Sequence, residues 1–280
     1  MSPAASETVV LSARVAAAFG VPREAHLLAG GFDRNTYRSG HVVLRRLGPD
    51  AVAEATWTAE LFDRLHRVRS PDFRVPRPLR GAGGSWIVDG WTAETFLEGR
   101  AARRSDAPAL VAAIQAFHAA IAHEPYPDFR RKPVRPPNPW DRADGWAWGE
   151  LPVPVDPRLV APLTRLARVR RPLPPLREQL IHGDLNPDNT LIAPGEPPAI
   201  IDMTPYWRPA GFAAAVAAYW LGPYRGDEHV LAHFEGVPHF DQLLVRAALR
   251  MLLTFRDLSD VGDVDQYAPA IDIICRRLSA

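Results

Sequence analysis

In the first third of the chain, short apolar runs separated by turn residues predict β-strands. Ser39-Gly40, a pair that favours a tight hairpin, separates Thr36–Arg38 from His41–Leu47. An earlier apolar run ends at Gly30-Gly31. Together these segments predict three short antiparallel strands between Leu27 and Leu47.

Two helices and two further strands are expected around these three strands. Apolar residues in Glu7–Phe19 recur close to the helical spacing, and a second helical pattern runs from Pro49 to about Val68. Residues 75–80 and 85–94 then predict two strands. The N-terminal part should therefore be a small five-stranded antiparallel sheet with one main helix packed on it.

After about residue 95 the pattern becomes that of amphipathic helices. Leu110, Ile114, Phe117 and Ile121 follow one another at helical spacing. Further helices are predicted over residues 159–169, 210–221, 240–255 and 267–278. Residues 124–157 are rich in proline and tryptophan and show no period, which indicates a functional lid or an insertion.

These patterns predict an α+β protein with two domains. Residues 1–94 would form the small sheet-containing domain, and residues 95–280 would form a larger, mostly helical one. A chain of 280 residues can bury a core of that size.

Composition narrows the class of protein. The chain is 47% hydrophobic and 23% charged, as in an ordinary globular protein. Its net charge of +1 gives no electrostatic reason to expect binding to nucleic acid or to an anionic membrane. Cys275 is the single cysteine, so no internal disulfide can form, which fits a reducing cytoplasm. No signal peptide or membrane-spanning run is found in the sequence, and a cytoplasmic protein is expected.

The strongest chemical signal lies between Leu180 and Asn189, which reads Leu-Ile-His-Gly-Asp-Leu-Asn-Pro-Asp-Asn. Asp184 and Asn189 are five residues apart, so a loop can curl back and place both on one wall of a pocket. A second apolar run ends at Asp202. One carboxylate, Asp184, would take or orient the proton of an acceptor hydroxyl, while Asn189 and Asp202 would hold Mg²⁺ on nucleotide phosphates.

His182 precedes this carboxylate and is interpreted as support for the loop. The His182 side chain could alternatively act as a metal ligand or as a base. A ring that hydrogen-bonds the loop backbone accounts better for its position.

A nucleotide would need contacts from the N-terminal part. Gly30 and Gly31 are expected to form a turn whose N–H groups could approach phosphate oxygens, although an ordinary hairpin turn is also possible. Arg45 alternates with its neighbours on an apolar strand and could pair with the α- and β-phosphates. Glu54 or Glu60 of the following helix would then hold Arg45.

With these residues in place, the chain resembles the aminoglycoside phosphotransferase and choline kinase-like group of small-molecule kinases, and more narrowly an actinobacterial subgroup. His182–Asn189 looks like the catalytic loop of that family, and Ile201-Asp202 looks like its second metal site. The resemblance implies a bilobal protein-kinase-like fold, Asp184 as the base, and Asn189 and Asp202 as Mg²⁺ ligands. It also implies that the backbone near Glu94 and Phe96 meets the purine of ATP or GTP.

The resemblance implies phosphoryl transfer to a hydroxyl of a small molecule. The near-neutral charge argues against nucleic acid or a membrane as a partner. The family usually has lysine where this chain has Arg45, whose planar guanidinium is longer than an ammonium group. Arg45 therefore either does the work of that lysine or weakens nucleotide binding. A nucleotide-binding regulatory module with little turnover is the alternative, and a metal-dependent phosphoesterase is a third reading. Should the acceptor be a cation, Asp141, Asp144 and Glu150 could line its pocket.

Overall fold

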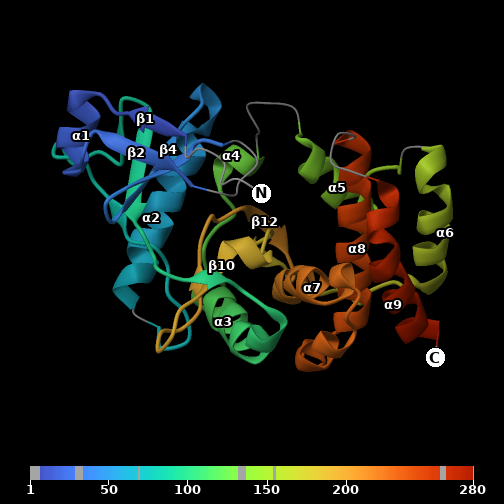
Figure 1. Cartoon of the computed structure of the whole chain (residues 1–280). Helices are drawn as coiled ribbons and strands as arrows, with labels where there is room; N and C mark the ends of the chain where they lie inside the picture. Colours follow the sequence, from blue (N-terminus) through green and yellow to red (C-terminus); the bar gives the residue numbers. More distant parts are fainter. Residues whose placement is uncertain are drawn as a thin grey trace. The chain divides into compact units, whose positions relative to one another are not determined.

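The computed structural model of the protein describes residues 7–28, 34–68, 70–131, 137–153, 156–258 and 263–279. It divides into two compact units (Figure 1). Residues 1–99 and Ala199–Ile201 form the first unit, whereas residues 100–198 and 202–280 form the second. The division of the chain falls between residues 99 and 100, whereas the sequence led us to expect it between residues 94 and 95. The short segment Ala199–Ile201 joins the first unit across a large gap in sequence.

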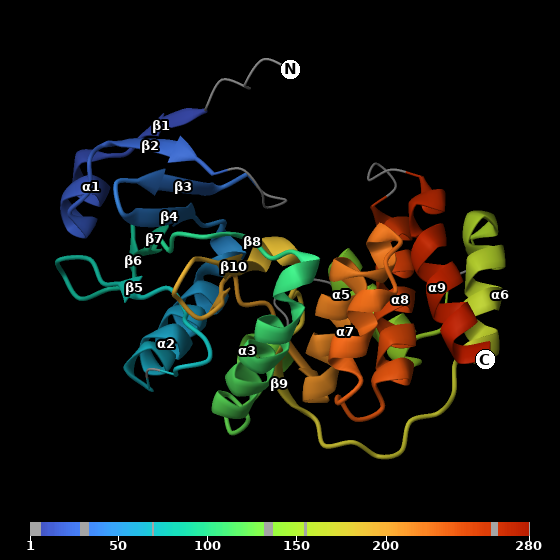
Figure 2. The same cartoon turned by 60° about the horizontal axis from the view of Figure 1, so that its bottom comes forward.

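The first unit is built on one antiparallel sheet, whose described strands follow the order β1-β2-β3-β4-β7-β5, with β6 also paired to β7 (Figure 2). The sheet is larger than the five strands expected. Its strands are β1 (Thr8–Val10), β2 (Glu24–Leu27), β3 (Thr36–Ser39), β4 (Val42–Arg46), β5 (Pro78–Leu79), β6 (Ile87–Val88) and β7 (Trp91–Thr95).

Two-residue turns set the register of this sheet. The expected hairpin at Gly40 is confirmed: the glycine has φ of 60°, and Ser39 pairs with Val42. Residues 85–94, expected as one strand, form a hairpin instead, because Asp89 and Gly90 both take positive φ. An Asp-Gly pair favours the type of turn whose twist matches the flanking strands.

The expectation of one helix over Glu7–Phe19 is wrong in its first half. Thr8–Val10 is the edge strand β1, paired with β2, and the β-branched residues there suit a strand. The helix α1 is restricted to Ala13–Phe19, because the Ser12 hydroxyl accepts a hydrogen bond from the Val15 N–H and so caps the helix at that point.

The core of the first unit lies between α1 and the sheet. Leu11, Val15 and Phe19 pack with Leu44 and Trp91 in one buried cluster. The helix α2 (Val52–Val68), preceded by the 3₁₀ turn Pro49–Ala51, buries Leu61, Phe62 and Leu65. The main helix of this unit is therefore confirmed at its predicted place.

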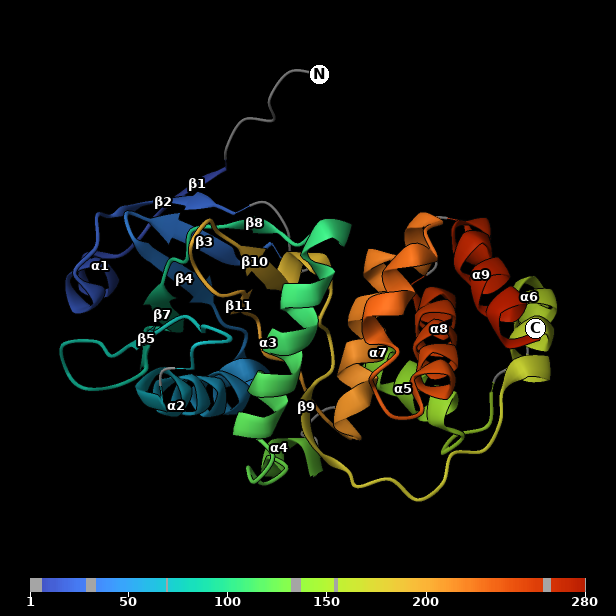
Figure 3. The ribbon, with the colours of Figure 1, turned by 90° about the horizontal axis from the view of Figure 1, so that it is seen from below.

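The second unit is mostly helical, as predicted. Helix α8 packs against α5, α7 and α9, and α6 packs against α9 (Figure 3). Its larger helices are α3 (Ala107–Ala120), α5 (Pro139–Trp148), α6 (Val160–Val169), α7 (Ala210–Leu221), α8 (Phe240–Asp257) and α9 (Ala268–Ser279). No helix in the described ranges is long and apolar enough to cross a membrane.

The prediction that residues 124–157 lack periodic structure is wrong. They contain α4 (Asp128–Arg131) and α5. The side chain of Asn138 caps α5, Pro139 occupies its first turn, and Gly149 ends it in the left-handed conformation. These three residues are ordinary helix boundary signals, and the density of prolines around them concealed the helix.

Short strands of the second unit carry the motif found in the sequence. β9 (Gln179–His182) pairs antiparallel with β12 (Pro205–Arg208). β10 (Thr190–Ile192) pairs with β8 (Arg100–Ala101). The segment between β9 and β10 holds the residues that the sequence predicts to be catalytic.

Candidate active site

The predicted catalytic loop begins at the end of a strand that is buried along its whole length. Every residue of β9 is buried, so the backbone that enters the loop is fixed on both faces. The Gly183 N–H donates to the Thr204 carbonyl at 2.8 Å, which extends the pairing of β9 and β12 by one step. Asp184 therefore leaves the sheet from a constrained position.

Residue 183 must be glycine in this packing. A β-carbon there would overlap the ring of Tyr206. Tyr206 is itself buried and lies on β12 opposite Ile181. The ring thus takes the space beside the loop, and the absence of a side chain at Gly183 lets the two backbones approach.

Hydrogen bonds from two asparagines fix the carboxylate of Asp184. The Asn189 Nδ2 donates to the Asp184 carbonyl at 2.8 Å and to Oδ2 at 3.2 Å. The Asn186 Nδ2 donates to the same Oδ2 at 3.2 Å. Asn186 also caps the 3₁₀ turn Pro187–Asn189 by accepting from the Asp188 and Asn189 N–H groups. The loop of five residues therefore does curl back, and it brings Asn189 against Asp184 as the spacing predicts.

An amide oxygen and a carboxylate of this unit have the chemistry that suits a hard cation such as Mg²⁺. Because the amide nitrogen of Asn189 donates to Asp184, its Oδ1 faces away from those bonds, and this oxygen accepts no hydrogen bond from a described residue. Asp202 is half-buried and has φ of 55°, a left-handed conformation that aspartate tolerates better than most residues. Amide and carboxylate oxygens are ligands that Mg²⁺ prefers. In the described ranges no three His, Cys, Asp or Glu side chains gather as a metal site, but a set of one amide, one carboxylate and phosphate oxygens needs no such group.

Two histidines behind the loop hold its backbone. His182 Nδ1 accepts from the Asp184 N–H at 3.2 Å, and the His182 N–H donates to His118 Nε2 at 3.2 Å. His118 Nδ1 lies 2.7 Å from the Ile114 carbonyl, so this nitrogen carries the proton. Burial lowers the pKa of His118 to about 4, with a smaller contribution from His182. This arrangement keeps His118 neutral and gives His182 the supporting geometry expected of it.

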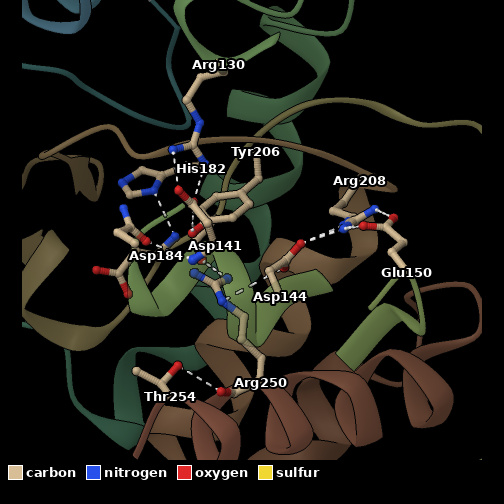
Figure 4. A network of polar contacts seen from close by, with 12 residues as sticks. Arg130, Asp141, Asp144, Glu150, His182, Asp184, Tyr206, Arg208, Arg250 and Thr254 are labelled. Carbon is tan, nitrogen blue, oxygen red and sulfur yellow. Dashed lines mark hydrogen bonds and ion pairs between the residues drawn. The ribbon is translucent and has the colours of Figure 1, made fainter. Parts of the chain in front are cut away.

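A buried arginine reaches the loop from helix α8. Arg250 is 1% exposed, and its Nη1 donates to the Gly183 carbonyl at 2.6 Å (Figure 4). Its guanidinium lies over the Tyr206 ring, and its Nε is 3.9 Å from Asp144 Oδ1. Burial opposes the charge, but Tyr206 and the nearby carboxylates of Asp144 and Asp184 raise the pKa of Arg250 above its usual value. Arg250 therefore remains a cation beside the catalytic loop.

The acidic residues that the sequence offers for a cationic acceptor are already paired. Asp141 accepts from Arg130 at 2.7 Å and from the Tyr206 hydroxyl at 3.1 Å. The Arg208 guanidinium donates hydrogen bonds to Asp144 at 2.6 Å and to Glu150 at 2.8 Å (Figure 4). These carboxylates act as internal counter-ions.

In the first unit, the two glutamates expected as partners for Arg45 differ in exposure. Arg45 lies on β4 on the face opposite the buried Leu44, and it is half-buried. Glu54 is half-buried in the first turn of α2, whereas Glu60 is exposed. Gly30 and Gly31 lie outside the described residues.

The expected purine-binding backbone is at the end of β7. Glu94 pairs with Val43 of β4, and the Phe96 N–H donates to the His41 carbonyl at 2.8 Å. The guanidinium of Arg38 lies 3.6 Å from the centre of the Phe96 ring. The Phe96 N–H is thus used within the unit, so a purine contact here would need the carbonyls or another N–H.

Sequence reasoning missed the residues that hold the loop from a distance. Tyr206, Arg208 and Arg250 lie on β12 and α8, and none stands in a recognisable motif. The one available signal was Arg250 itself, because an arginine inside the long apolar run of α8 needs a counter-charge when buried.

The chain is similar to known proteins in sequence and in fold. The profile of the APH group, described as the phosphotransferase enzyme family, matches residues 24–206. No curated protein matches the sequence. Three solved structures are similar. The microcompartment-associated aminopropanol kinase has a TM-score of 0.60 at 19% identity, covering 94% of this chain and 93% of its own. The spectinomycin phosphotransferase bound to ADP and spectinomycin has 0.52 at 14%, covering 92% and 90%. The choline kinase of Streptococcus pneumoniae has 0.52 at 14%, covering 89% and 94%. At these identities the likeness establishes the fold, which is that of the protein kinases.

Replacing Gly183 by alanine should displace the loop from Tyr206 and lower turnover by about a hundredfold, since a shift of about 1 Å in a reacting group can cost that much. The measurement is steady-state kinetics with the acceptor. Gly236→Ala is the matched control, because a β-carbon there meets nothing within 4 Å. Full activity in Gly183→Ala would show that the close approach to Tyr206 is unnecessary.

Stability should fall with acid because of His118. Its folded pKa of about 4 lies below the ordinary value, so the unfolded state binds more protons between about pH 6.5 and pH 4. Between about pH 7.5 and pH 5, the free energy of unfolding measured in urea should fall by about 2 kcal/mol less in His118→Gln than in wild type. His123→Gln, at an exposed position, should keep the wild-type pH dependence; an unchanged dependence in His118→Gln would contradict the assignment.

Arg250→Met should destabilise the protein by about 3–5 kcal/mol, because it removes the counter-charge of buried groups and leaves the Gly183 carbonyl without a donor. Arg246, one turn earlier on α8, is also buried but donates to the Gln242 and Arg171 carbonyls rather than to a carboxylate. Arg246→Met should therefore cost less, about 1–3 kcal/mol. Equal losses in denaturant unfolding would argue against a special role for Arg250.

Proposed function

The chain belongs to the phosphotransferase enzyme family, and on that premise we propose that it moves the γ-phosphoryl group of ATP, or of GTP, to a hydroxyl of a small molecule. Enzymes of this class act on an alcohol group. The finer proposal, that Asp184 is the base, rests on a difference in hydrogen bonding between the two oxygens of its carboxylate. Oδ2 accepts hydrogen bonds from Asn186 and Asn189, whereas Oδ1 accepts none from a described residue.

In this proposal Asp184 is the base. Its Oδ1 accepts the proton of the acceptor hydroxyl as the hydroxyl oxygen forms a bond to the γ-phosphorus. The bond from phosphorus to the oxygen bridging the β- and γ-phosphates breaks, and the nucleoside diphosphate leaves with that electron pair. Because Asn186 and Asn189 hold Oδ2, the carboxylate is oriented before the acceptor binds, which reduces the entropy cost of the reaction.

Asn189 and Asp202 are the residues that would hold Mg²⁺. Bound Mg²⁺ would neutralise the negative charge on the transferred and leaving phosphates. The Asn189 amide nitrogen donates to Asp184, so the same bond that orients the base would also aim the amide oxygen at the metal.

The first unit would supply the nucleotide contacts. Arg45, held by Glu54, would meet the α- and β-phosphates, and the backbone around Glu94 and Phe96 would meet the purine. The spectinomycin phosphotransferase with this fold was solved with ADP, which supports a nucleotide as the phosphoryl donor. The guanidinium of Arg45 can donate two N–H groups to phosphate oxygens, whereas the ammonium group of a lysine acts as a point charge.

The acceptor is a small molecule whose recognition does not depend on Asp141, Asp144 or Glu150. All three carboxylates bind arginines of the same unit. An acceptor with a cationic group would have to displace one of these ion pairs, which is costly where both partners are buried. A panel of sugars, nucleosides, amino alcohols and aminoglycosides, scored by nucleotide consumption, would identify the acceptor class.

The decisive test compares two aspartates of one loop. Asp184→Asn should lower kcat by about a hundredfold or more, because an amide cannot take the hydroxyl proton. Asp188→Asn, the same chemical change at an exposed position, should leave kcat close to wild type. Equal turnover in wild type and Asp184→Asn would exclude Asp184 as the base.

Two other outcomes would favour the alternative functions. Stabilisation of the fold by ATP with Mg²⁺, without phosphorylation of any acceptor in the panel, would favour a regulatory nucleotide-binding module. Hydrolysis of simple phosphate esters without any nucleotide would favour a phosphoesterase.

A further inference from the structure

A hollow of about 640 Å³ lies in the second unit, apart from the residues assigned to phosphoryl transfer. Residues 102–105, which follow β8, form one wall, and residues between Leu221 and His233, which follow α7, form the other. Asp184, Asn189 and Asp202 do not line it. A volume of this size is typical of sites that hold a small molecule.

The hollow carries an excess of positive charge. Its lining includes three arginines, Arg103, Arg104 and Arg225, against one carboxylate, Asp227. Arg104 binds Asp227 at 2.7 Å, which uses that carboxylate. Neither Arg103 nor Arg225 forms an ion pair with a carboxylate in the described part of the chain. Two guanidiniums thus remain available to an anion, unlike the arginines around the catalytic loop.

The wall that carries Arg225 is rigidly built. Both the Arg225 and the Asp227 N–H groups donate to the Gly222 carbonyl, at 2.8 Å and 3.1 Å. A β-carbon at Gly222 would lie 2.6 Å from the Asp227 carbonyl, so only glycine fits there. Asp227 Oδ1 accepts from the His229 N–H at 2.9 Å, while its Oδ2 accepts from Arg104 on the opposite wall. The two walls are therefore tied together before any ligand arrives, which lowers the entropy cost of binding.

The floor of the hollow is apolar. Ala102, Leu221 and Val230 line it, and each is at most 4% exposed as a whole residue. The ligand should therefore have an apolar part as well as a negative charge. Guanidinium groups match the geometry of phosphate oxygens by donating two parallel hydrogen bonds.

We propose that this hollow is a binding site for a small organic phosphate, with the phosphate between Arg103 and Arg225 and the organic part on the floor. The site is distinct from the one where the phosphoryl group is transferred. Ala102 also donates its N–H to the Pro187 and Thr190 carbonyls, at 3.1 Å and 3.0 Å. A ligand on this floor would thus lie against the strand that supports the Asn189 turn.

Titration calorimetry with phenyl phosphate as the probe tests the proposal. Wild type should bind it with a Kd below about 1 mM, and inorganic phosphate should bind more weakly because it lacks the apolar part. The double variant Arg103→Gln, Arg225→Gln should bind phenyl phosphate at least about tenfold more weakly, since charge-assisted bonds to both guanidiniums are lost. Both substituted side chains are exposed, and an unchanged melting temperature will verify that the variant folds.

The matched control is Arg168→Gln, an exposed arginine of α6 outside the hollow and without an ion pair among the described residues. It should bind phenyl phosphate as wild type does. Asp184→Asn should also bind it normally, so this test can succeed even where the proposed transfer reaction fails. Absence of binding up to about 10 mM, equal binding by the double variant, or equal affinity for inorganic phosphate would each overturn the proposal.

Discussion

The position of the loop that carries Asp184 depends on the hydrogen bond donated by the buried guanidinium of Arg250. This guanidinium joins helix α8 to the Gly183 carbonyl, faces Asp144, and lies over the Tyr206 ring. A charge this deep is tolerated only where carboxylates and hydrogen bonds surround it. The loop that carries Asp184 is therefore anchored from the helical core of its unit as well as by its own asparagines.

The arginines of the second unit fall into two groups with different consequences. Arg208 and Arg250 are buried, and Arg130 is half-buried. All three bind carboxylates or a carbonyl, and they hold α5, α8 and β12 around the loop. Arg103 and Arg225 are exposed and form no ion pair with a carboxylate in the described ranges. A guanidinium that is already paired stabilises structure, whereas one presented unpaired in a hollow is available to a ligand.

The carboxylates show the same contrast. Asp141, Asp144 and Glu150 are close in sequence and invite assignment to a cationic acceptor. Each of them binds an arginine instead: Asp141 binds Arg130, and the other two bind Arg208, which is distant in sequence. Asp184 instead accepts only amide N–H groups on one oxygen. An acidic residue at the end of a buried strand can act as a base when one of its oxygens accepts no hydrogen bond. A carboxylate in an ion pair would first have to break that pair, which costs free energy.

By itself the sequence determined the features that arise within short segments. The hairpin at Gly40, helix α2, helices α3 and α6 to α9, and the return of Asn189 to Asp184 all follow from local spacing, because turn residues and periodic apolar side chains act over a few positions. The sequence failed where local signals competed: Thr8–Val10 became a strand through pairing with β2, and Asp89-Gly90 divided an expected strand into a hairpin. Only the tertiary structure decided what Arg250, Tyr206 and Asp144 do, since each acts through partners distant along the chain. The sequence shows the charge of such a residue, but the packing of helices and strands determines which residue of opposite charge lies beside it.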